Sequence, residues 1–193
     1  METGMKNKFK EIVRREIERE GIYGFMEYLE KDTDFYDAPA STKFHGNFKG
    51  GLLEHSVKVY EVLCDLVRLF NLEISGESLA LCGLFHDVCK VNFYKRGTRN
   101  VKGEDGRWTT KEIWEIADKL PLGHGEKSCI ILQSYMSMRV DELLAIRWHM
   151  GGYDTAVKGG DWSISKAQEN VNLVTLLQVA DMVASNILER SVD

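Results

Sequence analysis

The chain has 193 residues, and its 28% charged and 44% hydrophobic content is ordinary for a globular protein. One domain is therefore expected over residues 1–193, large enough to bury a substantial core. The net charge of −5 argues against broad binding along a nucleic-acid duplex. No apolar run is long enough for a membrane span or a signal peptide. The four cysteines lack CxxC spacing, so we expect reduced thiols and a cytoplasmic location.

The first part of the chain predicts two amphipathic helices and a long loop. The helices are expected over residues 5–20 and 22–31, separated by Gly21. Apolar residues at helical spacing form one face of the first helix: Phe9, Ile12, Val13 and Ile17. Residues 32–51 are expected to form a loop with a glycine cluster, and long loops in compact domains are often functional.

Two stronger helices are expected next, over residues 52–71 and 77–90, because their apolar positions follow the helical period. One side of the second helix comprises Leu79, Cys82, Gly83, His86 and Lys90. Residues 91–116 differ, because their aromatic and β-branched residues favour strands and residues 103–106 are typical of a turn. This stretch predicts a small β-hairpin, or flap, inserted between helices.

The rest of the chain again predicts helices. A loop over 121–125 precedes helices over 126–138 and 140–149, and an irregular stretch over 153–160 precedes a helix over 165–190. The predicted fold class is therefore all-α, a helical bundle with a small inserted β-hairpin.

Histidines and aspartates carry the chemical signal of this sequence. Four of its histidines lie at helix positions facing the expected core or at helix ends beside glycines. Asp87 and Asp181 lie on apolar helix faces, where a lone carboxylate would be costly to bury. Imidazole and carboxylate groups that share a cation remove that cost. Two such cations can clamp a phosphoryl group and lower the pKa of a bound water. The cysteines lack ligand spacing, which excludes a zinc finger.

Two strings match a known pattern. Residues 45–56, HGNFKGGLLEHS, resemble the HGxxxGGLLEHS-type opening of HD-domain proteins, and residues 86–90, HDVCK, resemble their HDxxK signature. His124, His149 and Asp181 resemble the remaining ligands of the extended, two-metal version of this pattern. The resemblance runs from about residue 43 to residue 185, which is most of the chain.

The resemblance implies an HD-domain helical bundle with a metal centre between its helices. The implied metal ligands are His55, His86, Asp87, His124, His149 and Asp181. Asp87 would bridge a first ion to a second one, with His124 and His149 completing the second. The implied cofactor is one or two divalent ions of Mn, Fe, Ni, Mg or Zn. The expected layout is N-terminal helices at 1–36, a metal-binding core at 43–90 and 117–190, and the flap at 91–116.

The function implied by the resemblance is metal-dependent hydrolysis of a phosphoester bond by a metal-activated water. The expected substrate is a phosphorylated small molecule, a nucleotide, a cyclic nucleotide or a short single-stranded nucleic acid. Asp87 and Lys90 are the predicted catalytic residues. The predicted substrate-binding residues are His45, Lys90, Lys95 and Arg96. Lys90 favours the phosphodiesterase branch, and the sequence indicates no particular oligomeric state.

Several alternatives stay open at this point. The protein can be a nucleotidase or dNTP phosphohydrolase, an HD-type di-iron oxygenase that acts on a small acidic substrate, or a non-catalytic binding module. His124 and His149 can bind substrate phosphate beside a single metal ion, and His45 can serve only in a turn. Lys90 can be a helix-end lysine whose ammonium reaches solvent, and the basic, aromatic flap can be simply a solvated hairpin.

Overall fold

The computed structural model describes residues 2–43, 45–103 and 106–189. The helices and strands are α1 (Glu2–Glu16), α2 (Ile22–Lys31), α3 (Gly51–Leu69), α4 (Gly76–Phe85), β1 (Tyr94–Lys102), β2 (Trp108–Ile116), α5 (His124–Gln133), α6 (Val140–Arg147), α7 (Thr155–Lys158), α8 (Ser163–Asn170) and α9 (Asn172–Val183). Shorter turns are 3-10 in type at Val88–Lys90 and Gly151–Tyr153 and π in type at Ala184–Leu188. The predicted all-α bundle with one inserted hairpin is confirmed, whereas its single-domain layout stays a prediction.

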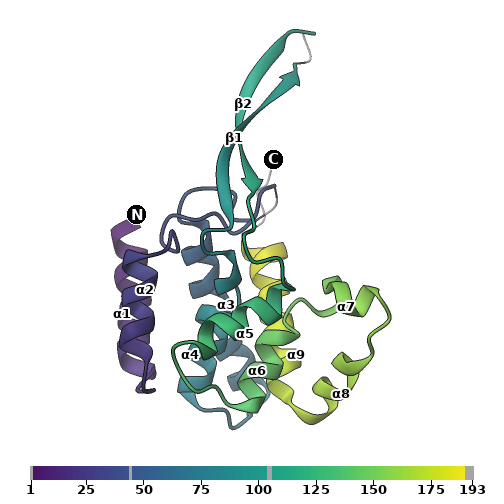
Figure 1. The fold of residues 1–193 in the computed structure, drawn as a ribbon. Coiled ribbons are helices and arrows are strands. Elements are labelled where there is room, and N and C mark those ends of the chain that lie inside the picture. The colour runs from purple at the N-terminus through teal and green to yellow at the C-terminus, as the bar shows by residue number, and fades with distance from the viewer. Residues whose placement is uncertain (1, 44, 104–105, 190–193) are drawn as a thin grey trace.

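The elements surround one core that lies beneath a protruding hairpin. In Figure 1, α1 and α2 lie along one edge of the helical body, and α7 and α8 lie at the opposite edge. Between them, α3, α4, α5, α6 and α9 pack together, and the β1–β2 hairpin projects from one end. The largest fully buried side chains are mostly phenylalanines and leucines, including Phe9, Phe25, Phe85 and Leu177.

The predicted apolar face of the first helix is confirmed, but its end is not. Phe9, Ile12, Val13 and Ile17 are all buried. The helix begins at Glu2 and ends at Glu16, whereas residues 5–20 were expected. It stops early because the following backbone turns to make tertiary bonds: the Glu18 amide donates to the Glu77 carboxylate at 3.1 Å.

Helices α3 and α4 approach each other closely at Gly83. A β-carbon at Gly83 would lie 2.6 Å from the Cα atom of Tyr60, so a larger residue would push the helices apart. This contact places the end of α4 beside the start of α3. His86, which follows α4, and His55, on α3, are thereby brought together.

The helix predicted over 77–90 is wrong at its end, because α4 stops at Phe85. Asp87 adopts φ −103° and ψ 17°, outside the α-helical region, and Val88–Lys90 forms a 3-10 turn. The His86 ring donates from Nδ1 to the Gly83 carbonyl at 3.0 Å, and the Lys90 amide donates to the Asp87 carbonyl at 2.9 Å. Lys90 is therefore a near neighbour of Asp87 rather than a member of a continuous helix face.

The hairpin predicted within 91–116 is confirmed. Its strands β1 and β2 are antiparallel, and their register runs from Tyr94 opposite Ile116 to Lys102 opposite Trp108. The predicted turn at 103–106 includes Glu104 and Asp105, which lie outside the described residues. On its far side Gly106 has φ +78°, a conformation that favours glycine.

The C-terminal helices differ most from expectation. The loop predicted over 121–125 ends early, because α5 already begins at His124, and α5 and α6 end before the predicted residues 138 and 149. Part of the irregular stretch forms the short helix α7.

The helix predicted over 165–190 is two helices. Val171 has extended backbone, and it separates α8 from α9. The end predicted at Arg190 lies outside the described residues. Within the described ranges, no single helix is long and apolar enough to cross a membrane; α8, α9 and the π turn reach that level only as a pair bent by 107°.

An ion-pair network joins the N-terminal helices to the bundle. The Arg19 guanidinium contacts the Glu142 carboxylate at 2.5 and 2.9 Å and that of Glu77 at 2.8 Å. Glu142 is fully buried, and it also accepts hydrogen bonds from the Ser78 hydroxyl and the Arg139 amide. Burial opposes ionisation of Glu142, but Arg19 and these donors outweigh it and lower its pKa.

We expect Arg19→Ala to lower the free energy of unfolding by about 3–5 kcal/mol, because it leaves the buried Glu142 carboxylate uncompensated. Urea denaturation measures this change. Arg68→Ala is the matched control, since Arg68 pairs with Asp65 on the surface with 76% of its side chain exposed, and we expect a change within about 1 kcal/mol. Equal effects of the two substitutions would contradict the role given to the network.

Candidate metal centre

His55 on α3 lies at the centre of a buried cluster. Its Nε2 atom is 3.3 Å from Oδ1 of Asp181, which comes from α9, and 3.7 Å from Oδ2 of Asp87. The same Nε2 atom is 3.3 Å from Nε2 of His86. Three segments that are distant in sequence therefore direct nitrogen and oxygen atoms toward one point, and the His55, His86 and Asp181 ligand atoms all lie within 4.8 Å of one another.

Backbone carbonyls fix two of the imidazole rings. His86 donates from Nδ1 to the Gly83 carbonyl at 3.0 Å, and His149 donates from Nδ1 to the Ile146 carbonyl at 2.7 Å. In a neutral imidazole with its proton on Nδ1, the other nitrogen carries a free lone pair. Both Nε2 atoms are thereby prepared to act as ligands, which is the arrangement that metal-binding histidines use.

Asp87 links the two sides of the cluster. Its Oδ1 atom is 3.4 Å from Nε2 of His149, and its Oδ2 atom is 2.5 Å from Nζ of Lys90. Burial opposes ionisation of this carboxyl group, but the charge of the Lys90 ammonium outweighs burial and holds its pKa well below the usual range. Asp87 is therefore an ionised, fully enclosed carboxylate.

Different surroundings give the buried histidines His55 and His86 different pKa values. Burial opposes the charged form of His55, yet its bonds to Asp181 and Glu189 raise its pKa to about 9. Burial dominates at His86 and lowers its pKa to about 4. His55 is thus the histidine that carboxylates contact on both ring nitrogens.

The donor set fits a divalent cation. Among the described residues, Nε2 of His149 is a buried atom without a hydrogen-bond partner, because its contact with Asp87 lacks hydrogen-bond geometry. An unpaired buried nitrogen costs free energy unless a ligand uses it. Two or three imidazoles with two carboxylates form a mixed nitrogen–oxygen set that suits Mn, Fe, Ni and Zn. The His55, His86 and Asp181 groups could therefore hold a metal ion.

His124 lies near this cluster but is not part of it. It is half-buried at the start of α5, and its ring packs edge-on to Phe93 with centroids 5.9 Å apart. Burial lowers its pKa, while the charge of Asp87 acts in the opposite direction. No contact found among the described residues joins His124 directly to the other five predicted ligands. Its assignment to a second ion stays a prediction.

The predicted substrate-binding residues divide into two groups. His45 and Lys90 lie at the cluster: the His45 ring is 4.9 Å from that of His55 between centroids, and Lys90 pairs with Asp87. Lys95 and Arg96 lie on the exposed hairpin instead. There Lys95 is 3.3 Å from Glu115, and the Arg96 guanidinium stacks 3.8 Å from the centre of the Trp114 ring.

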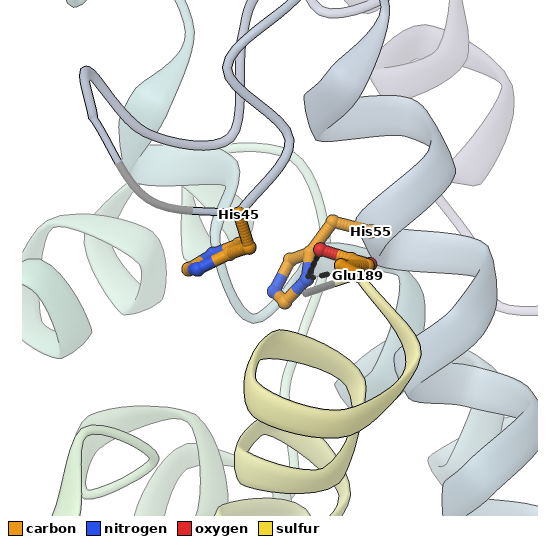
Figure 2. A group of neighbouring side chains, drawn as sticks. All are labelled: His45, His55 and Glu189. Carbon is orange, nitrogen blue, oxygen red and sulfur yellow. Dashed lines mark hydrogen bonds and ion pairs between the residues drawn. The ribbon is translucent and has the colours of Figure 1, made fainter. Parts of the chain in front are cut away.

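Sequence reasoning missed Glu189. Its two carboxylate oxygens lie 3.3 and 3.2 Å from Nδ1 of His55, and its side chain is 5% exposed (Figure 2). The residue follows the π turn after α9, so helical periodicity counted from Asp181 does not place it on the same face. No motif in the sequence identified it.

The chain belongs to the HD domain family, which it matches over residues 52–186. It is also similar to dihydroneopterin 2',3'-cyclic phosphate phosphodiesterase from Methanocaldococcus jannaschii, with 27% identity over 94 residues. That match covers 47% of this chain and only 35% of the archaeal protein. No solved structure matches the chain significantly. The resemblance inferred from the two sequence strings is thus confirmed at the level of the family.

We expect His149→Phe to weaken Mn²⁺ binding at least about tenfold. It should lower the free energy of unfolding of the chelator-treated protein by only about 0.5–1.5 kcal/mol, the net contribution of one hydrogen bond. The reason is that Nε2 of His149 makes no hydrogen bond, so the variant loses only the one from Nδ1 to the Ile146 carbonyl. Calorimetric titration with Mn²⁺ and urea denaturation provide the two measurements.

His124→Phe is the comparison for that experiment. If His124 binds a second ion, this variant loses one equivalent of Mn²⁺ and retains the other. Unchanged affinity and stoichiometry in His149→Phe would contradict the assignment of His149 as a ligand.

Proposed function

We propose that this protein is a metal-dependent phosphohydrolase that hydrolyses a phosphoester bond of a nucleotide, a cyclic nucleotide or a short single-stranded nucleic acid. The observation that carries this proposal is the convergence of His55, His86, Asp87 and Asp181 in the interior of an HD-family chain. Similarity to a cyclic-phosphate phosphodiesterase supports the phosphodiester branch. We also propose a cytoplasmic setting, which agrees with the four free cysteines.

The proposed ligands of the first ion are His55, His86, Asp87 and Asp181. A divalent cation bound by them would supply Lewis-acid polarisation of a phosphoryl oxygen and an activated water. The two oxygens of the ionised Asp87 carboxylate have different neighbours. Oδ1 faces His149, and Oδ2 faces His55 and His86. This geometry supports the proposal that Asp87 and His149 would also hold a second ion, with His124 as the third proposed ligand.

Lys90 is proposed to act as a fixed positive charge. Burial opposes its protonation, but the Asp87 carboxylate outweighs burial and raises the Lys90 pKa above its ordinary value. A lysine that stays protonated cannot serve as a general base at neutral pH. Its ammonium can instead stabilise negative charge that develops on the phosphoryl oxygens or the leaving group.

His45 is proposed to contact the substrate from the loop before α3. It is half-buried, its Nε2 atom is 3.5 Å from the Ser185 hydroxyl, and burial lowers its pKa. A neutral imidazole can donate to or accept from a substrate oxygen. Lys95 and Arg96 are proposed to meet the phosphates of a longer substrate. They follow Tyr94 at the base of the hairpin, and the Tyr94 hydroxyl donates to the Ala40 carbonyl at 3.5 Å, in the loop that also carries His45.

A substrate panel tests the proposed activity. Chromogenic mono- and diesters, dNTPs, NMPs, cyclic nucleotides and short RNA are each assayed with added Mn, Mg, Ni or Fe. We expect metal-dependent cleavage of at least one diester, and no cleavage by Asp87→Asn.

The other outcomes of the panel identify the competing functions. Cleavage of nucleoside mono- or triphosphates alone would indicate the nucleotidase branch. Stoichiometric iron with substrate-dependent O₂ uptake would indicate an oxygenase and contradict hydrolysis.

We expect Lys90→Met to lower kcat about 10²- to 10³-fold, because it removes a preorganised charge next to the reacting group. Metal content should stay near that of the wild type, since Lys90 is not a proposed ligand. Steady-state kinetics and elemental analysis measure the two quantities. Lys166→Met is the control, because Lys166 pairs with Glu169 on the exposed surface of α8. Loss of the metal together with activity in Lys90→Met would contradict this role.

A further inference from the structure

Glu189 lies beyond the residues that match the HD family, yet it contacts the central histidine of the cluster. The family match ends at residue 186. Both carboxylate oxygens of Glu189 are within hydrogen-bond distance of Nδ1 of His55, at 3.2 and 3.3 Å. Figure 2 shows Glu189 approaching His55 from the end of the C-terminal helix, with His45 on the other side of the ring.

The two ring nitrogens of His55 have different partners. Nε2 faces Asp181 and His86, whereas Nδ1 faces Glu189. An imidazole that offers a lone pair from Nε2 must carry its proton on Nδ1. A carboxylate that accepts this proton in a hydrogen bond fixes the tautomer and the ring orientation and makes Nε2 a stronger donor to a cation.

The π turn explains how Glu189 reaches this position. In a continuous α-helix Leu188 would share the face of Asp181, because seven residues complete about two turns. The Glu189 amide instead donates to the carbonyl of Ala184, five residues earlier, at 3.0 Å. This wider turn inserts one residue, so Glu189 takes the place that Leu188 would otherwise occupy. The exposures agree: Leu188 is 52% exposed, and the Glu189 side chain is 5% exposed.

Two other uses of Glu189 are weaker. The first is an ion pair with Lys58, but Nζ of Lys58 is 4.0 Å from the Glu189 carboxylate and only 2.6 Å from that of Glu54. The second is a separate cation held by His45, His55 and Glu189, whose ligand atoms lie close together. Such a cation would bind Nδ1 of His55. The ring could then bind the other ion through Nε2 only if it lost both of its protons.

We infer that Glu189 is a positioning residue for His55, and that the π turn at Ala184–Leu188 exists in this chain to direct its carboxylate onto Nδ1 of that ring. This role rests on the metal-dependent function proposed above. It acts through the metal affinity and the orientation of the histidine rather than through contact with the substrate.

Metal binding by Glu189 variants tests this role directly. Wild type, Glu189→Gln and Glu189→Ala are stripped with chelator and titrated calorimetrically with Mn²⁺. We expect Glu189→Ala to bind about 10- to 100-fold more weakly, as for other partners of metal-bound histidines. Glu189→Gln should be intermediate, because its amide oxygen still accepts the hydrogen bond without the charge. In ¹⁵N spectra of the Zn²⁺-loaded protein, the Nδ1 proton of His55 should exchange slowly in the wild type and rapidly in Glu189→Ala.

Matched controls separate positioning from general charge or stability. Glu54→Gln removes a carboxylate from the same region, and Lys58→Met removes the other partner of Glu189; both should retain the wild-type affinity. Unfolding in the presence of chelator measures stability without the metal.

Four results would overturn the inference. These are wild-type affinity in Glu189→Ala, equal weakening by Glu54→Gln, equal weakening by Lys58→Met, and anomalous scattering from a cation between His45 and Glu189. If His55→Ala itself leaves Mn²⁺ affinity unchanged, the proposed function fails as well, and the role of Glu189 fails with it. Weakened binding in His55→Ala but not in Glu189→Ala removes only the inference.

Discussion

The arrangement of this molecule depends on placing an ionised carboxylate, Asp87, inside a helical core. Burying such a charge alone would cost several kcal/mol, so its surroundings must supply compensating positive charge or donors. The Lys90 ammonium, 2.5 Å from the carboxylate, provides that compensation. Consecutive residues of an α-helix point about 100° apart and cannot face one point. The end of α4 at Phe85 solves this problem, because the non-helical backbone at Asp87 lets two adjacent side chains reach the same cluster.

Close contacts between helix backbones fix the relative positions of the residues in the cluster. Gly83 allows α4 to touch α3 at Tyr60, and a β-carbon at Gly125 would lie 2.0 Å from the Arg147 carbonyl oxygen, so α5 and α6 also meet without side chains between them. Small residues at these crossings fix the distances between the helices that carry His55 and His124 and the helix that precedes His149. The precision of the site therefore comes from interhelical packing, which the ligand residues themselves do not determine.

Local sequence signals predicted those features that depend on neighbouring residues. The apolar face of α1, the hairpin and the family motifs are of this kind, and the cluster of His55, His86, Asp87 and Asp181 followed from the motifs. The break after Phe85 and the division at Val171 were not predicted, because the helical spacing of apolar residues continues across both positions. Glu189 was missed because a π turn shifts it by one position, and nothing in the sequence marks such a turn. The assignment of each ligand stays a prediction.

The projecting hairpin has a consequence for how copies of this protein behave at high concentration. A ribbon of only two strands has no interior strand, so each strand leaves one row of backbone amides and carbonyls available to a neighbouring chain. Nine paired positions form a long template for such sheet extension. Lys95, Arg99 and Lys111 on β1 and β2 introduce like charges that would repel one another between copies. Repulsion between these like charges opposes edge-to-edge pairing of two hairpins.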